Sequence, residues 1–308
     1  MLLPDYVKKI DLPTPYAVGA VSIYYFAKAD TAIDIGPDQK STAELLNEAG
    51  VKTDKLRILA THGHDDHIGI AKNRQFSRFF LNDADADWLM YKYPGNDIAE
   101  KNLLKLGLPP LYVQGILNVI ERIFKKISVP VYEAINEGEL FDLDGRTFIT
   151  IGTAGHTPGS VSFFLKDEGI LFSGDAVLAD ITSNPGTIFV VSVPVGKCNF
   201  NPIKNYLETL DKLESIAPVL IAGSHGKLVE NPKERIRELR RSYIERIEKT
   251  YYMLKTNPMT IFETARMIFR NHTADDDLIL QLGEAMSYIY YLKNLNLIIR
   301  KGLKWYTV

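Results

Sequence analysis

Residues 61–69 read THGHDDHIG, and this stretch says more about the fold than any other part of the 308-residue chain. Three histidines and two aspartates occupy six consecutive positions. The resulting pattern is H-x-H-x-D-H, formed by His62, His64, Asp66 and His67. Imidazole and carboxylate groups are costly to bury without partners, so this density of them needs a chemical reason. The spacing predicts a metal-binding site.

The segment before this motif is expected to be a strand. Residues 56–61 (LRILAT) form a short apolar run of the kind found in buried strands. Since side chains alternate along a strand, His62 and His64 are expected to point the same way. Asp66 and His67 are expected in the turn that follows, with their side chains directed at a second point next to the one that His62 and His64 face. This arrangement predicts two adjacent half-sites for metal ions.

Three further ligand-type side chains follow predicted strands later in the chain. They are His156 in GHTPGS, Asp175 in SGDAV and His225 in SHG. Open α/β sheets place their sites at the carboxyl ends of strands, and the neighbouring glycines let backbone and ligands approach closely. Five of the six histidines are therefore expected to converge, and only His272 is expected to be uninvolved.

Composition limits what else the chain can be. A single cysteine, Cys198, excludes an intrachain disulfide and a cysteine-based zinc cluster. The apolar fraction of 46% and charged fraction of 24% are typical of soluble globular proteins. Residues 1–15 lack the apolar run of a signal peptide, and the apolar run 186–196 is shorter than the roughly 20 residues that span a bilayer. We expect a soluble cytoplasmic protein with no membrane partner.

The pattern of elements divides the chain into two parts. Residues 1–230 are expected to form an α/β domain, interrupted by a helical insertion at about residues 83–130. From residue 231 the sequence predicts one long amphipathic helix, two further helices and a short terminal hairpin. This order of elements indicates a winged-helix-like C-terminal unit spanning residues 231–308.

Charge is also unevenly distributed. Residues 232–308 hold 14 Lys+Arg and 9 Asp+Glu, a net charge of +5. The rest of the chain holds 22 and 29, a net charge of −7, which gives −2 for the whole. Such an asymmetry is compatible with a solvated basic face, with a partner subunit, or with nucleic acid.

The ordered set of motifs resembles the metallo-β-lactamase fold superfamily over roughly residues 16–230. Residues 32–37 (AIDIGP) are similar to that family's early strand. The resemblance implies an αββα sandwich with a shared two-metal site. It assigns His62, His64 and His156 to one metal, assigns Asp66, His67 and His225 to the second, and makes Asp175 the bridge. The C-terminal unit resembles the extension of the β-lactamase-like protein 2 group.

The chemistry implied by this resemblance is hydrolysis. Two divalent ions, zinc first and iron or manganese as alternatives, share a hydroxide that attacks an ester, thioester or lactone, as in glyoxalase II. Asp66 is both a ligand and a candidate acceptor or orienter of the water proton. Asp65 is expected to accept a hydrogen bond from the ring of a ligand histidine. A small-molecule substrate and a homodimer are the expected partners, and the substrate-binding residues are not identified.

Other functions stay open from the sequence. Because the C-terminal unit is basic, the alternative hydrolase is a metal-dependent endoribonuclease that acts on single-stranded RNA. A mononuclear iron oxidoreductase of the persulfide dioxygenase kind shares the same motif. A non-catalytic regulatory protein that uses the C-terminal unit is a third class, and the complete ligand set argues against it.

Overall fold

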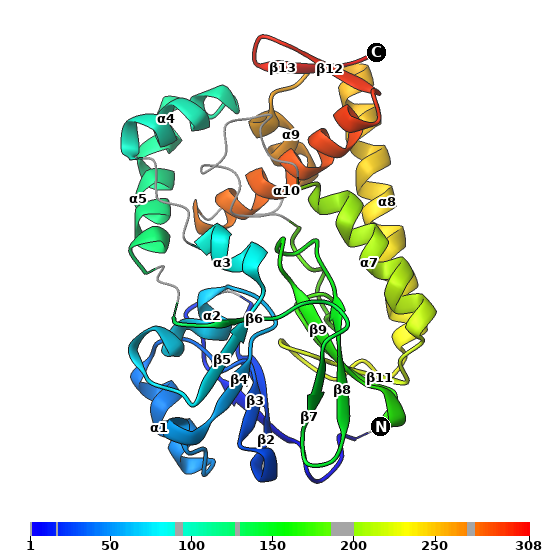
Figure 1. The fold of residues 1–308 in the computed structure, drawn as a ribbon. Coiled ribbons are helices and arrows are strands. Elements are labelled where there is room, and N and C mark those ends of the chain that lie inside the picture. The colour runs from blue at the N-terminus through cyan, green and yellow to red at the C-terminus, as the bar shows by residue number, and fades with distance from the viewer. Residues whose placement is uncertain (1, 17, 90–94, 127–129, 186–199, 270–274) are drawn as a thin grey trace. The chain divides into compact units, whose positions relative to one another are not determined.

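The computed structural model describes residues 2–16, 18–89, 95–126, 130–185, 200–269 and 275–308 (Figure 1). The chain forms two compact units. The first comprises Met1–Met90, Ile127–Ser183 and Glu208–Arg237, and the second comprises Tyr91–Lys126, Asn184–Leu207 and Glu238–Val308. Among the described residues, no helix is both long and apolar enough to cross a bilayer. Cys198, His272 and the apolar run 186–196 lie outside the described residues.

Two mixed sheets form the centre of the first unit. The six-stranded sheet has the order β1 (Lys8–Leu12), β2 (Val21–Phe26), β3 (Thr31–Ile33), β4 (Arg57–Leu59), β5 (Arg78–Leu81) and β6 (Glu133–Ala134). The five-stranded sheet has the order β11 (Leu220–Gly223), β10 (Ile170–Gly174), β9 (Val161–Leu165), β8 (Thr147–Gly152) and β7 (Leu140–Asp142). In the first sheet β3, β4, β5 and β6 pair in parallel, and in the second only β10 and β11 do. Parallel pairing brings the carboxyl ends of β3 and β4, and of β10 and β11, to a common edge.

Alternation along the strands explains how the layers pack. In β2, Tyr24 and Phe26 belong to the apolar core between the sheets, while Ile23 belongs to the cluster on the other face. Phe148 and Phe172 of the second sheet meet Phe26 edge-on, with ring centroids 5.2 and 5.7 Å away. Because β2 is buried on both faces, its sequence is almost uniformly apolar.

Helices cover the outer faces of both sheets in this unit. α1 (Lys40–Glu48) contributes Leu46 to the cluster on the outer face of the six-stranded sheet. The later turns of α7 (Pro202–Ile216) bond to the end of the five-stranded sheet, where Thr209 Oγ1 donates to the Ala154 carbonyl at 2.8 Å. The expected αββα sandwich is thus confirmed. Strand β1 lies ahead of residues 16–230, the part of the chain that carries the family resemblance.

The second unit contains most of the predicted insertion together with the C-terminal helices. Its elements are α4 (Asn96–Lys105), α5 (Pro110–Lys126), the first turns of α7, most of α8 (Pro232–Thr256), α9 (Ile261–Ile268), α10 (Asp275–Asn294) and the hairpin β12 (Ile298–Lys301) with β13 (Lys304–Thr307). The predicted order of helices followed by a terminal hairpin is present.

The turn between α4 and α5 packs tightly against the start of α9. Gly107 has a φ of +84°, and a Cβ there would lie 2.4 Å from Cβ of Thr260. Thr260 caps α9, because its Oγ1 accepts from the Glu263 backbone N–H at 3.1 Å. The insertion helices α4 and α5 are therefore part of the same compact unit as α9. Helix α3 (Asp83–Leu89) stays in the first unit.

Candidate metal centre

The H-x-H-x-D-H motif begins after strand β4, not within it. β4 ends at Leu59, because the Thr61 backbone N–H donates to Oδ1 of Asp34 at 2.8 Å instead of extending the ladder. The expectation that strand alternation aligns His62 and His64 is therefore wrong. The loop that leaves the sheet at this point is what brings the two rings together.

The second half of the motif is helical. α2 (Asp65–Ile68) begins immediately after His64, whose carbonyl accepts from the backbone N–H groups of His67 and Ile68 at 3.1 Å. Asp66 and His67 thus lie on a single helical turn. The sequence placed both residues in the turn that follows the strand, and the structure shows this turn to be helical, with both side chains facing the site.

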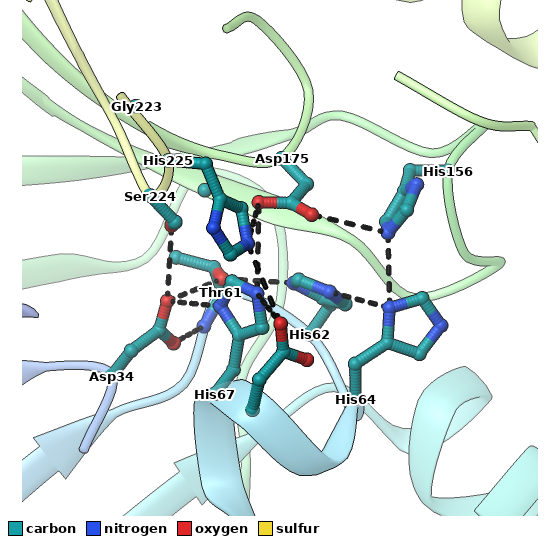
Figure 2. Close-up of polar contacts among 12 residues, drawn as sticks. Asp34, Thr61, His62, His64, His67, His156, Asp175, Gly223, Ser224 and His225 are labelled. Carbon is teal, nitrogen blue, oxygen red and sulfur yellow. Dashed lines mark hydrogen bonds and ion pairs between the residues drawn. The ribbon is translucent and has the colours of Figure 1, made fainter. Parts of the chain in front are cut away.

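Three histidines form one cluster of potential ligands (Figure 2). His62 Nε2 and His156 Nε2 each lie 3.0 Å from Nδ1 of His64. One ligand atom from each of the three lies within 4.8 Å of the others. Imidazole nitrogens at this mutual spacing are suited to one tetrahedral or octahedral cation.

A second cluster combines two histidines with a carboxylate. His225 Nε2 lies 3.4 Å from Oδ2 of Asp66, and His67 Nε2 lies 3.8 Å from the same oxygen. One ligand atom from each of these three residues also lies within 4.8 Å of the other two. The donor set differs from the first cluster, because it includes an anionic oxygen ligand.

Asp175, directly after β10, faces both clusters (Figure 2). Its Oδ1 lies 3.6 Å from Nε2 of both His67 and His225. Its Oδ2 lies 3.5 Å from Nε2 of His156. All seven residues predicted from the sequence are thus brought together, with Asp175 between the two groups as the resemblance implies.

The polar atoms at this centre fit metal ions. His67 Nε2, His225 Nε2 and Asp175 Oδ1 are buried and have no hydrogen-bond partner. Such groups are rare in proteins, because each one costs about 1 to 3 kcal/mol when it is left unpaired. Cations between these atoms would remove that cost, so the residues present fit two divalent ions.

The other nitrogen of three rings is already occupied. His67 Nδ1 lies 2.8 Å from Oδ2 of Asp34, and His225 Nδ1 lies 2.9 Å from the Ala20 carbonyl. His62 Nδ1 lies 3.0 Å from Oγ1 of Thr61, which donates its own proton to Asp34. Each partner favours a proton on Nδ1, so Nε2 is the ring nitrogen that is directed at the site.

The two clusters differ in protonation. Burial and the neighbouring His156 lower the pKa of His64 to about 3. Burial alone would lower the pKa of His67 too, but the carboxylates of Asp175, Asp66 and Asp34 raise it to about 10. His64 is therefore neutral and ready to bind a cation at neutral pH, whereas His67 must first lose a proton.

Asp34 is the main residue at the centre that sequence reasoning did not single out. It lies in AIDIGP, at a φ of 58°, and is fully buried. The sequence pointed to the segment AIDIGP, but nothing local in it indicates the contact of Asp34 with His67, which lies 33 positions away. Asp65, which was expected to bond a ligand histidine, instead accepts from Lys72 Nζ at 2.6 Å. Its partly exposed position on the first turn of α2 explains this difference.

Asp85 is a second buried carboxylate that the sequence did not reveal. Its Oδ2 accepts from the Gly63 backbone N–H and from Thr157 Oγ1, both at 2.8 Å, and its Oδ1 accepts from the Gly159 backbone N–H at 2.6 Å. Burial raises its pKa to about 6, against the opposing effect of these three donors.

Comparison with known families agrees with this geometry. The family model described as the metallo-beta-lactamase superfamily matches residues 33–225, which include all seven candidate ligands. The probable metallo-hydrolase YqjP of Bacillus subtilis is 26% identical over 92% of this chain and 91% of its own length. A beta-lactamase-like protein 2 homolog of Caenorhabditis elegans is 23% identical over 63% of this chain and 61% of its own. An atrochrysone carboxyl ACP thioesterase of Aspergillus fumigatus is 25% identical over 43% of this chain and 38% of its own.

A solved structure supports the same fold over the full length. The metallo-beta-lactamase family protein TTHA1429 of Thermus thermophilus superposes with a TM-score of 0.85, at 21% identity, and covers 100% of both chains. At this identity the likeness speaks for the fold, including the arrangement of the C-terminal helices, and not for the reaction.

Proposed function

Because this chain belongs to the metallo-beta-lactamase superfamily, we propose that it is a hydrolase that works with two divalent cations, zinc in the first instance. His62, His64 and His156 would hold one cation, and Asp66, His67 and His225 the other, with Asp175 shared. The three orphaned buried atoms at the centre are the observation that carries this proposal. Without a cation, the burial of these atoms would cost desolvation free energy that no interaction offsets.

When bound, two such cations supply a hydroxide nucleophile near neutral pH and polarise the carbonyl under attack. The chain's own residues set up the rest of the chemistry. Burial would raise the pKa of Asp66, but His67 and His225 beside it hold that pKa below its ordinary value. Asp66 therefore stays ionised, and its carboxylate can accept a hydrogen bond from the attacking water and orient it. The Nδ1 contacts of His67 and His225 keep their rings in one orientation throughout the cycle.

We propose an ester, thioester or lactone of a small molecule as the substrate. All three present an acyl carbonyl next to a leaving oxygen or sulfur, which suits hydrolysis by the hydroxide that two divalent cations would supply. The similarity to an acyl carrier protein thioesterase supports the thioester within this group. The fold by itself hosts many reactions, so the substrate class depends on the site and on this similarity.

A two-stage experiment tests the proposal. Elemental analysis of the purified protein should find close to two divalent ions per chain, and zinc should support the highest turnover. A panel of aryl esters, acyl thioesters, lactones and single-stranded RNA then identifies the substrate class. The doubly substituted His64→Ala, Asp175→Ala protein should lose all activity. One iron per chain together with oxygen uptake would contradict the hydrolase and favour the dioxygenase.

The second candidate is an endoribonuclease for single-stranded RNA. One observation favours it, namely the net charge of +5 on residues 232–308. Phosphate contacts release counterions, so RNA affinity should fall steeply as salt rises if these lysines and arginines contact the backbone. Cleavage of RNA with a steep salt dependence, and no turnover of any acyl substrate, would replace the first candidate with the second.

A further inference from the structure

One buried carboxylate of the first unit lies between two loops that carry metal-facing histidines. Asp85 belongs to α3 and accepts hydrogen bonds from both loops at once. Gly63, on one side, is the residue between His62 and His64. Thr157 and Gly159, on the other side, follow closely after His156. Asp85 belongs to none of the clusters that could hold an ion.

α3 approaches both loops closely at two glycines. A Cβ added at Gly159 would lie 2.6 Å from the backbone nitrogen of Asp85. A Cβ added at Gly63 would lie 2.8 Å from Cδ1 of Leu89, on the same helix. Gly159 is therefore required for this close approach, because a Cβ there would meet backbone, whereas a Cβ at Gly63 would displace only the end of the Leu89 side chain. The position of each loop is tied to the position of Asp85.

The two loops together supply every histidine of the first cluster and none of the second. His62 and His64 come from one loop and His156 from the other, whereas His67 lies on α2 and His225 follows β11. We propose that Asp85 is a positioning residue that holds the His62–His64 loop and the His156 loop in register, and thereby sets the affinity of the three-histidine half-site. This inference rests on the proposed metal centre.

The three donors require a carboxylate. An ionised carboxylate offers two oxygens that only accept, so it satisfies donors on both sides. An asparagine has one oxygen, and its amide nitrogen would face an N–H group or the Thr157 hydroxyl. The Asp85→Asn side chain can therefore keep the Gly63 and Thr157 contacts or the Gly159 contact, but not both sets. Asp85→Asn therefore breaks the link between the two loops with almost no change in side-chain volume.

Cobalt(II) titration of the metal-free full-length chain measures the effect on each half-site. Visible absorption follows the two binding steps, and His156→Ala and His225→Ala identify which step belongs to which half-site. For Asp85→Asn we expect the affinity of the three-histidine half-site to fall about 10- to 100-fold, the range found for groups that orient metal ligands. The affinity of the half-site of Asp66, His67 and His225 should stay within about twofold.

A matched pair of threonine variants covers the case in which Asp85→Asn does not fold. Thr157→Val removes one of the three donors to Asp85. Thr150→Val removes an equally buried hydroxyl that has no hydrogen-bond partner. We expect several-fold weaker cobalt binding at the three-histidine half-site for the first and no change for the second.

The possible contrary results are distinguishable. Equal weakening of both half-sites by Asp85→Asn or Thr157→Val would make Asp85 a general structural residue and overturn the inference. Unchanged affinity at the three-histidine half-site would overturn it as well, and neither result touches the proposed hydrolase. A wild-type chain that takes up no divalent cation would overturn the proposed function and this inference together.

Discussion

Asp34 and His67 lie 33 residues apart in the sequence, yet Oδ2 of Asp34 is 2.8 Å from Nδ1 of His67, with both side chains buried. Asp34 also accepts two hydrogen bonds from Thr61, through its backbone N–H and its hydroxyl. The Asp34 carboxylate therefore holds two groups. One is the His67 ring, which faces the second cation position, and the other is Thr61, whose hydroxyl contacts the His62 ring.

Replacing Asp34 should weaken the second half-site. In Asp34→Asn the amide nitrogen must face either the Thr61 N–H or Nδ1 of His67, and the latter favours the tautomer whose Nε2 carries a proton. We expect cation affinity at that half-site to fall about 10- to 100-fold. Competition with a chelator of known affinity measures it. Asp30→Asn is the matched control, because Asp30 also has a positive φ, of 43°, but lies away from the centre. Equal losses in both variants would show that the backbone conformation, and not the histidine contact, is responsible.

His67 and His64 should differ in charge in the metal-free protein. The pKa of His67 is raised to about 10 and that of His64 is lowered to about 3. At pH 7 nitrogen-15 NMR of the ring nitrogens should find His67 as the imidazolium and His64 as the neutral ring. Because a bound cation must displace the His67 proton, affinity at the second half-site should rise by up to about tenfold per pH unit below pH 10. A neutral His67 ring at pH 7, or an affinity independent of pH, would contradict this prediction.

Asp85 should make the metal-free protein less stable as pH rises. Its pKa is raised from 3.8 to about 6 in the folded state, so between these values the folded chain binds more protons than the unfolded chain. The contribution of this group is then most favourable below about pH 4 and falls through pH 6, by about 3 kcal/mol. In urea unfolding, the free energy of unfolding of Asp85→Asn relative to that of the wild type should therefore rise by a similar amount between about pH 4 and pH 7. A constant difference across that range would mean that burial does not raise the pKa of Asp85.

Divalent cations should stabilise the folded chain. The orphaned atoms of His67, His225 and Asp175 gain partners only when cations are present. Zinc at about 100 times its dissociation constant should add about 2.7 kcal/mol. For a chain of this size that corresponds to a rise of about 4 °C in the unfolding temperature. Differential scanning calorimetry with and without a chelator measures this shift. Asp175→Ala should show a much smaller one, and an equal shift in that variant would mean that zinc binds elsewhere.

The candidate ligands were predictable because their signal is local. Each follows a short apolar run and sits near glycines, as His156 does in GHTPGS, so chemistry and approximate position can both be read from neighbouring residues. The same local information predicted a long helix from residue 231, and α8 is observed at Pro232–Thr256.

The supporting residues were not predictable in the same way. Asp34 acts on His67 across 33 positions, and Asp85 acts on Gly159 across 74. Their roles depend on backbone groups that only the folded chain brings near, and no spacing rule connects them. The strand conformation expected at His62 was wrong for a related reason. The carboxylate of Asp34, which follows β3, accepts the Thr61 N–H, and β4 ends before His62.

Bound cations would also act as cross-links in this chain. His64 and His156 are 92 residues apart, and a shared ion would close that segment into a loop, as a disulfide does in a secreted protein. With one cysteine the chain has no covalent means to do this. A link made of imidazole and carboxylate is indifferent to thiol reductants but sensitive to chelators and acid. The folded lifetime of the first unit would thus follow the supply of metal in its surroundings, not their redox state.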